Sequence, residues 1–179
     1  MSEYIPRLQE AIVSAMRGMT REEMLRERQG KWSIAQVFEH LYLTYTGTVK
    51  GCERSLASPS SLATPQTAKQ RVMTLVVVRL GFYPRGIQSP QQVRPKGIPI
   101  EQQVISDIER QITVMDESLT RCEKRLGRHN KLFNHPVLGA LTADQWRKFH
   151  WLHGRHHIRQ VLALRRKYEK EKAPASAGA

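Results

Sequence analysis

The sequence has few cysteines, few acidic residues and no long apolar run. Its longest apolar stretch, Val72–Leu80, is interrupted by Thr74 and Arg79 and is far shorter than the roughly 20 residues that a membrane-spanning helix needs. We therefore expect no membrane partner. The segment Met1–Pro6 has neither the basic nor the apolar region of an export signal, so cytoplasm is the default expectation.

The two cysteines, Cys52 and Cys122, fall on the apolar stripes of predicted helices and form no Cys-x-x-Cys pair. Such cysteines behave as small hydrophobic residues, and a disulfide is not expected in a reducing compartment. A nucleophilic thiol would need a lowered pKa and exposure, and nothing in the sequence indicates either. We interpret both as buried free thiols.

Acidic residues are outnumbered by basic ones, 16 to 29, which gives a formal charge of +13 and a pI near 10.3. This excess of positive charge indicates what the protein binds rather than how it folds. Three interpretations stay open: a solvated face, an anionic small substrate or cofactor, and nucleic acid. Nucleic acid is the least favoured, because the sequence contains no base-stacking motif or DNA-reading module.

The apolar residues recur at helical spacing over residues 4–16, 33–56, 67–80 and 100–126, and again from 142 onwards. The capping boxes Ser33–Gln36 and Thr142–Gln145 mark two of the helix starts, and Thr20–Glu23 marks a short extra helix. In the 67–80 helix, the expected apolar positions are Val72, Leu75, Val76 and Leu80.

No segment alternates apolar and polar residues for long enough to predict a sheet, and His135, placed before a proline, is expected in a loop. The predicted fold is all-α, an antiparallel four-helix bundle with a long Pro/Gly-rich crossover at 81–99 that forms a rim or lid. A chain of 179 residues fits one domain, which we place at 1–168, followed by a disordered tail at 169–179.

The last predicted helix holds four of the seven histidines within eight positions. His153 and His157 are four residues apart, so they lie on the same helix face, where both reach one small ion. His150 shares that face, whereas His156 falls roughly 80° off it and is a second-choice ligand or outer-shell residue. These spacings predict half of a metal site.

The missing ligand has to come from another helix, and His40 is the only histidine on any predicted helix but the last, with Glu39 beside it as a carboxylate substitute. Three histidines suit zinc, nickel, iron or copper, and a catalytic site leaves one position open for water or substrate. The alternative is that His40 is structural and that the histidine-rich helix is a solvated or partner-binding face. Spacing alone does not decide between the two.

Several short motifs occur in a characteristic order: Lys31-Trp32-Ser33-Ile34, Glu39-His40-Leu41, the run from His135 to Thr142, Gln145-Trp146, and the run from His153 to Gln160. Over residues 19–164 this order resembles the DinB-like superfamily, especially its branch of uncharacterised domains. The resemblance implies a four-helix bundle that holds zinc or nickel through three histidines, which on this chain are His40, His153 and His157. Relatives include transferases and isomerases that use low-molecular-weight thiols, and others are described as hydrolases.

The leading hypothesis is therefore a metal-dependent transferase acting on a small-molecule substrate through a metal-activated low-molecular-weight thiol, itself anionic. The alternatives are a metal-dependent hydrolase and a non-enzymatic basic bundle that binds nucleic acid or an acidic partner. Gln160 and His150 are the candidate catalytic residues, with Gln160 placed to orient a ligand or substrate. Trp32, Tyr42, Trp146 and His150 are candidates for lining the cleft. Whether the chain forms a homodimer stays open.

Overall fold

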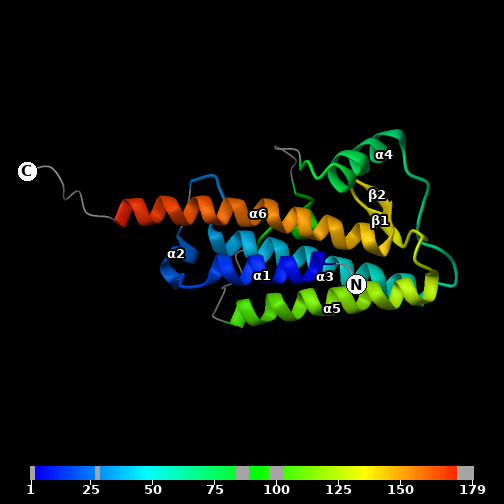
Figure 1. Cartoon of the computed structure of the whole chain (residues 1–179), viewed down its shortest axis with the longest axis horizontal. Coiled ribbons are helices and arrows are strands. Elements are labelled where there is room, and N and C mark those ends of the chain that lie inside the picture. The colour runs from blue at the N-terminus through cyan, green and yellow to red at the C-terminus, as the bar shows by residue number, and fades with distance from the viewer. Residues whose placement is uncertain (1–2, 27–28, 84–88, 97–102, 173–179) are drawn as a thin grey trace, which may run out of the picture.

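The computed structural model describes residues 3–26, 29–83, 89–96 and 103–172, and for residues 103–106 and 172 only the backbone. Its body is made of four long helices that run side by side along the long axis (Figure 1): α1 (Tyr4–Met16), α3 (Ile34–Ala57), α5 (Gln103–Leu126) and α6 (Ala143–Lys172). Helix α1 packs on α6, α3 packs on α5, and both α3 and α5 contact α6. The protein is mostly helical, as expected.

The chain directions differ from a simple up-and-down order. Helices α1 and α6 run one way, and α3 and α5 run the other (Figure 1). The most extensive packing therefore joins parallel partners, while the contact between α3 and α6 is antiparallel. A long crossover between α3 and α5 makes this possible, because parallel neighbours need a connection that returns to the starting end.

The predicted capping boxes are confirmed. The Ser33 hydroxyl accepts from the Gln36 backbone N–H at 3.2 Å, and the Gln36 side chain accepts from the Ser33 N–H at 2.9 Å. Thr142 and Gln145 make the same reciprocal pair, at 3.3 and 3.0 Å. Each box satisfies two backbone N–H groups that would otherwise lack partners, and so fixes the start of a histidine-bearing helix. A third box opens the short helix α2 (Arg21–Leu25) at Thr20.

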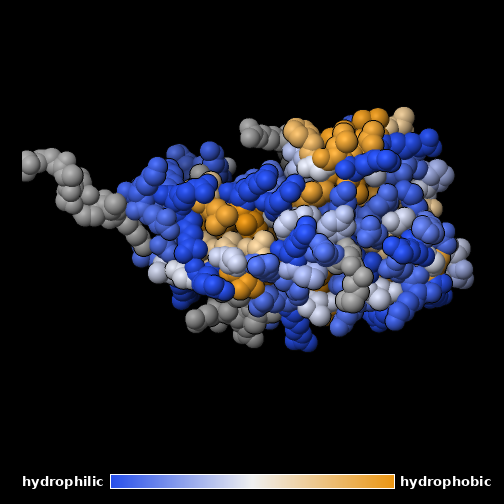
Figure 2. Space-filling view, viewed as in Figure 1, coloured by the Kyte–Doolittle hydropathy of each residue, from blue (hydrophilic) through white to orange (hydrophobic). Residues whose placement is uncertain are grey.

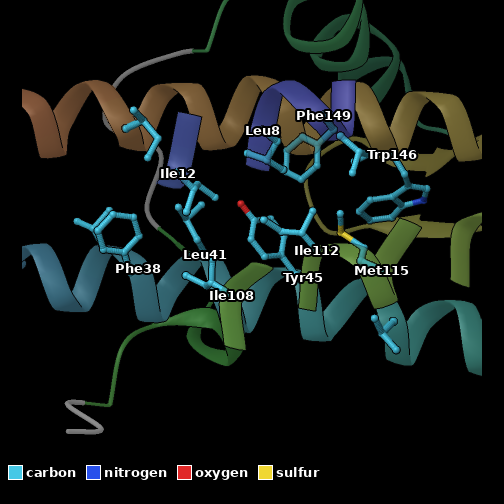
Figure 3. Close-up of a cluster of buried hydrophobic side chains, with 14 of the residues drawn as sticks. Leu8, Ile12, Phe38, Leu41, Tyr45, Ile108, Ile112, Met115, Trp146 and Phe149 are labelled. Carbon is cyan, nitrogen blue, oxygen red and sulfur yellow. The ribbon is translucent and has the colours of Figure 1, made fainter. Parts of the chain in front are cut away.

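The core lies between the four helices (Figure 3) and contains the stripes predicted from the spacing. Leu8 and Ile12 come from α1, Phe38, Leu41 and Tyr45 from α3, Ile108, Ile112 and Met115 from α5, and Trp146 and Phe149 from α6. Cys52 and Cys122 are both buried and free, as predicted. This packing brings α3 against α6 and thus positions the histidines.

The predicted burial of the 67–80 segment is wrong. Here α4 (Ala68–Thr74) buries none of its residues, and Val72, Leu75 and Leu80 are 58%, 48% and 70% exposed. The following turn, η1 (Leu75–Arg79), is a π-helix, in which the Leu80 N–H donates to the Leu75 carbonyl at 3.0 Å. The extra residue in that turn changes which side chains face inward, so Val77 and Val78 are the buried ones. Figure 2 shows the resulting apolar surface over α4.

The expectation of no sheet is also wrong. Strands β1 (Phe133–His135) and β2 (Gly139–Leu141) form an antiparallel hairpin in which Phe133 pairs with Leu141. His135 therefore lies in a strand rather than in a loop, and its Nδ1 accepts from the backbone N–H groups of Val137 and Leu138. Strands of three residues are too short for period-two alternation to be visible in the sequence.

The ends of several predicted segments lie outside the described residues. The predicted helix start at 100 does so, as do positions 84–88 and 97–99 of the crossover, whose described part contains the 3-10 turn η2 (Gln91–Val93). Helix α6 continues to Lys172, past the predicted domain end at 168, and residues 173–179 lie outside. None of the helices in the described ranges is long and apolar enough to cross a membrane.

Candidate metal centre

Three buried histidines converge between α3 and α6. His40 lies in the second turn of α3, and His153 and His157 lie one turn apart on α6. The Nε2 atom of His153 is 3.2 Å from the Nε2 atom of His40 and 3.1 Å from that of His157. All three ligand atoms lie within 4.8 Å of one another, and among the described residues no other group of His, Cys or acidic side chains is arranged in this way.

The outer nitrogens of two of these rings have hydrogen-bond partners that fix the tautomer. The Nδ1–H of His40 donates to the backbone carbonyl of Val93 at 2.7 Å, and that of His157 donates to the Oε1 atom of Gln160 at 2.9 Å. Both acceptors are oxygens, so the protons lie on Nδ1 and the Nε2 lone pairs point at the centre. Metal-bound histidines are commonly held by such partners.

Burial keeps the three imidazoles neutral. Desolvation lowers the pKa of His40, although its bond to Val93 opposes the shift. Desolvation, followed by the nearby His40 and His156, lowers the pKa of His157 to about 3. The pKa of His153 falls well below its ordinary value, first through desolvation and then through the proximity of His157 and His40. Neutral imidazole is the form that binds a metal ion, so the site is in this form at neutral pH.

Two of the three separations between the ligand nitrogens suit a tetrahedral ion. Imidazole nitrogens that bind zinc at about 2.0–2.1 Å lie about 3.3 Å apart along an edge of the tetrahedron, close to the two separations given above. A cation also resolves a hydrogen-bonding conflict, because without one at least two Nε2 lone pairs face each other at the centre. The Nδ1 atom of His153 has no partner among the described residues, so no change of tautomer satisfies this ring completely.

A short segment of the crossover is tied to α3 at adjacent positions. Val93 accepts from His40, and the backbone N–H of Lys96 donates to the Oε1 atom of Glu39 at 2.7 Å. Glu39, the carboxylate considered as a substitute ligand, is 5% exposed and faces this segment instead. The predicted rim is therefore, in its described part, attached to the helix that carries His40.

Aromatic rings surround the triad. The ring centroid of Trp32 is 5.1 Å from that of His40 and 6.5 Å from that of His157. Tyr83, which follows η1, packs on His153 at 5.5 Å, and Phe149 stacks on the same imidazole at 5.4 Å. Trp32 thus lies beside the site, as expected for a lining residue, and Tyr83 is an addition that the sequence did not indicate.

Of the remaining candidate residues, His150 and Trp146 lie deeper in the core. His150 is fully buried, with its Nε2 atom 2.9 Å from the Thr48 hydroxyl and its ring against Tyr45. Trp146 stacks on Phe133 at 4.7 Å, and Tyr42 is partly buried against the core. The structure thus brings together His40, His153, His157, Gln160 and Trp32, and it places His150, Trp146 and Tyr42 outside the converging triad.

Gln160 links two histidines. Its Oε1 atom accepts from His157, and its amide nitrogen lies 3.0 Å from the Nε2 atom of His156. His156 is half-buried and packs on Tyr83 at 4.8 Å, so it belongs to the surroundings of the triad, as its position off the helix stripe suggested. Val93 acts through its backbone carbonyl, so no residue type in the sequence could have revealed its role.

An open surface cavity of ≈ 580 Å³ lies beside the centre. It lies between the segment before α3 and the C-terminal half of α6, and it is lined by Gly30, Lys31, Trp32, Val37, Gln160, Ala163, Leu164 and Lys167. Two of these residues, Trp32 and Gln160, also contact ligands of the candidate centre. The cavity is within the size range of small-molecule sites.

A family model described as "Protein of unknown function (DUF1569)" matches residues 4–163. The match covers most of the chain and includes all three histidines, and the chain belongs to this family. No curated protein and no solved structure matches the chain significantly. The family description assigns no activity, so the function has to be argued from the site.

Proposed function

We propose that this protein is a metal-dependent enzyme with one divalent cation, zinc or nickel, held by His40, His153 and His157. The observation that carries the proposal is the convergence of three buried Nε2 atoms, two of them with lone pairs oriented by partners at Nδ1. Burial of three imidazoles costs free energy that a structural role does not require. A cation at their focus offsets that cost.

Three histidine ligands would leave one coordination position open, and a cation held this way would supply Lewis acidity that lowers the pKa of a thiol or water at that position. The residues of the chain orient the ligands and shield the centre from water. Val93 and Gln160 fix the orientation of two imidazoles, and the rings of Trp32, Tyr83 and Phe149 keep water from the flanks of the triad. Gln160 is a positioning residue, because it acts through His157.

We further propose that the chain is a DinB-like four-helix bundle. Four long helices with a crossover between α3 and α5 support this assignment, as does the order of the Trp-Ser and His-Leu motifs before the paired histidines. In the proposed reaction the sulfur of a low-molecular-weight thiol loses its proton and forms a bond to an electrophilic carbon of a small-molecule substrate, which releases its leaving group. The basic surface suits an anionic thiol. Hydrolysis by an activated water is the second candidate, since the same open position takes either nucleophile.

Metal content tests the centre. Protein purified without a polyhistidine tag is expected to contain about one zinc or nickel ion per chain by elemental analysis, and both His40→Ala and His157→Ala should lose it. The matched control is His129→Ala, because His129 is an exposed histidine after α5. Wild-type protein that contains no metal and takes none up after incubation with either ion would overturn the proposal.

A turnover screen separates the reactions. Thiols combined with electrophilic acceptors are compared with simple esters and amides on the same metal-loaded protein. Thiol-dependent turnover that disappears after chelation supports the transferase, and thiol-independent turnover of esters or amides supports the hydrolase. Salt-sensitive binding of nucleic acid that is indifferent to chelators, with turnover of neither kind, would instead favour the basic bundle without enzymatic activity.

A further inference from the structure

The cavity beside the centre has a distinctive lining. Val37, Ala163, Leu164 and the ring of Trp32 give it apolar walls, and Gln160 adds an amide. Gln160 and Trp32 separate it from the triad by one layer of side chains, because Gln160 holds His157 and Trp32 packs on His40. A molecule in this cavity is therefore next to the histidines.

Among the described residues, the charged groups that line the cavity have one sign. They are the two ammonium groups of Lys31 and Lys167, and none of the described lining residues carries a carboxylate. Lys167 is 3.6 Å from Glu171, which partly compensates its charge. Lys31 is exposed and forms no ion pair with any residue in the described ranges. An uncompensated cation at the rim of an apolar cavity favours a ligand that is anionic at one end.

We propose that this cavity binds the anionic group of the small-molecule ligand and that Lys31 is the residue that recognises it. The inference rests on the proposed metal-dependent function, which it deepens by assigning a class of ligand. The ligand carries a carboxylate or phosphate that lies against Lys31 and Lys167. An apolar middle part packs on Trp32 and Leu164, and the reacting end extends past Gln160 towards the triad.

Two features of the cavity decide this division of roles. An ammonium group binds an anion as a compact point charge from the rim, where its long side chain can adjust. The buried Leu164 and Val37 cannot satisfy a charged group, so the charge of the ligand stays at the rim and its apolar part goes inside.

Binding is measured by calorimetry with four probes on metal-loaded and metal-free protein. S-methylglutathione carries carboxylates and no free thiol, glutathione carries both, cysteamine carries a thiol and no anion, and inorganic phosphate is an anion alone. S-methylglutathione is expected to bind both forms of the protein with similar affinity, because its recognition lies outside the triad. If phosphate is the only anionic probe that binds, the ligand class is a phosphate ester. If S-methylglutathione and glutathione bind, the ligand carries a carboxylate.

Two matched pairs of variants locate the site. Lys31→Gln is expected to weaken S-methylglutathione binding about threefold to tenfold, as for loss of a partly exposed charge contact, and to leave cysteamine binding unchanged. Its control, Lys50→Gln on α3, should have no effect, because Lys50 is exposed and does not line the cavity. Ala163→Trp should fill the cavity and reduce binding at least about tenfold, whereas Leu162→Trp, one residue away and outside the lining, should not.

The possible failures are distinguishable. Binding of anionic probes that persists unchanged in both Lys31→Gln and Ala163→Trp, or no binding of any anionic probe to wild type, overturns the assignment of the cavity even if the protein contains its metal. Absence of metal with intact, Lys31-dependent binding of S-methylglutathione overturns the proposed function and leaves the anion site standing. Metal content of each variant, measured in parallel, shows that the centre itself is unchanged.

Discussion

The imidazole of His40 donates its Nδ1–H to the backbone carbonyl of Val93 across 2.7 Å. A candidate metal ligand on a core helix is thus oriented by a residue of the crossover, more than fifty positions later in the chain. The adjacent residue, Glu39, holds the same segment through the Lys96 N–H. The orientation of His40 and the attachment of the segment around Val93 to α3 are therefore linked. A change that loosens this segment should also reduce metal affinity.

Glu39→Ala tests this link. Loss of the carboxylate removes the hydrogen-bond partner of the Lys96 N–H. We therefore expect metal affinity to fall about tenfold, which is the low end of the effect of removing a residue that orients a metal ligand. Residues 89–96 should also become more sensitive to protease. Competition with a chromogenic chelator and limited proteolysis measure the two effects. The control, Glu53→Ala on the exposed side of α3, should change neither. Unchanged affinity together with unchanged proteolysis in Glu39→Ala would show that the segment does not support His40.

Gln160 offers a second test, because its two polar atoms contact different histidines. Gln160→Leu removes the acceptor for the His157 Nδ1–H, so metal affinity should fall about 10- to 100-fold. Gln160→Glu keeps an oxygen at the same position and should retain most of the affinity. Chelator competition measures both variants. Equal losses in the two would mean that the side chain acts by packing rather than by accepting this hydrogen bond.

Local patterns were sufficient to predict the four long helices and the pair His153 and His157. Ser33 and Thr142 marked the helix starts because a capping box is a contact within four residues, and the spacing of His153 and His157 placed them on one helix face for the same reason. His40 was predicted as the third ligand because it is the only histidine on any other predicted helix, and because the resemblance to the DinB-like superfamily implies it. The sequence did not show that α3 and α6 are in contact where His40 faces His153 and His157. The structure supplied this contact.

The features that were not predicted depend on contacts far apart in the sequence. Leu75 and Leu80 fit a helical stripe, but a π-turn, stabilised by packing on α6, gives the buried positions to Val77 and Val78. The role of Val93 rests on a backbone carbonyl, which every residue has. Neither leaves a signal in residue type or spacing, because both are decided by tertiary structure.

Two glycines of α3 provide a packing test. A Cβ atom at Gly51 would lie 2.6 Å from the Cζ atom of Phe133, whose ring stacks on Trp146, whereas a Cβ atom at Gly47 meets nothing within 4 Å. Gly51→Ala should therefore destabilise the fold by about 1–3 kcal/mol through overpacking. Gly47→Ala should stabilise it by about 0.5–1 kcal/mol, because alanine is the better helix former. Urea unfolding measures both, and a stabilising Gly51→Ala would contradict the close packing of β1 on α3.

Arg147 joins α6 to α5 through three side chains. Its guanidinium donates to Asp116 at 2.6 Å, to Glu123 at 2.8 Å and to Thr120 at 2.8 Å, and its side chain is only 9% exposed. Arg147→Met should cost about 2 kcal/mol of unfolding free energy, less than for a fully buried pair because both carboxylates are partly solvated.

The matched control for Arg147→Met is Arg7→Met, which breaks the exposed pair with Glu3 and should cost less than about 0.5 kcal/mol. Metal content should be unchanged in both, since neither arginine touches the triad. Chemical unfolding and elemental analysis check the two statements. Loss of metal in Arg147→Met would mean that the contact between α5 and α6 supports the centre at a distance.

Buried histidines make the stability of the metal-free protein depend on pH. Desolvation lowers the pKa of His150 to about 3, with a smaller contribution from His135, and burial lowers the pKa of His135 to about 4. In the unfolded chain both bind protons near the ordinary value of about 6.5. Their contribution to stability is therefore complete above that pH and is lost as the pH falls from about 6.5 towards the folded-state values, at up to about 1.4 kcal/mol per pH unit for each histidine.

Urea unfolding at about pH 7, 6 and 5 should show this decline, and His150→Phe should reduce its slope, because one titrating group is removed from the buried set. The change in slope is the readout, since loss of the contact with Thr48 alters absolute stability at every pH. His129→Gln, at an exposed position, should leave the slope as in wild type. A slope that is equally steep in His150→Phe would place the acid sensitivity elsewhere in the chain. Bound metal should postpone the decline to lower pH, because protons must then compete with the cation for His40, His153 and His157.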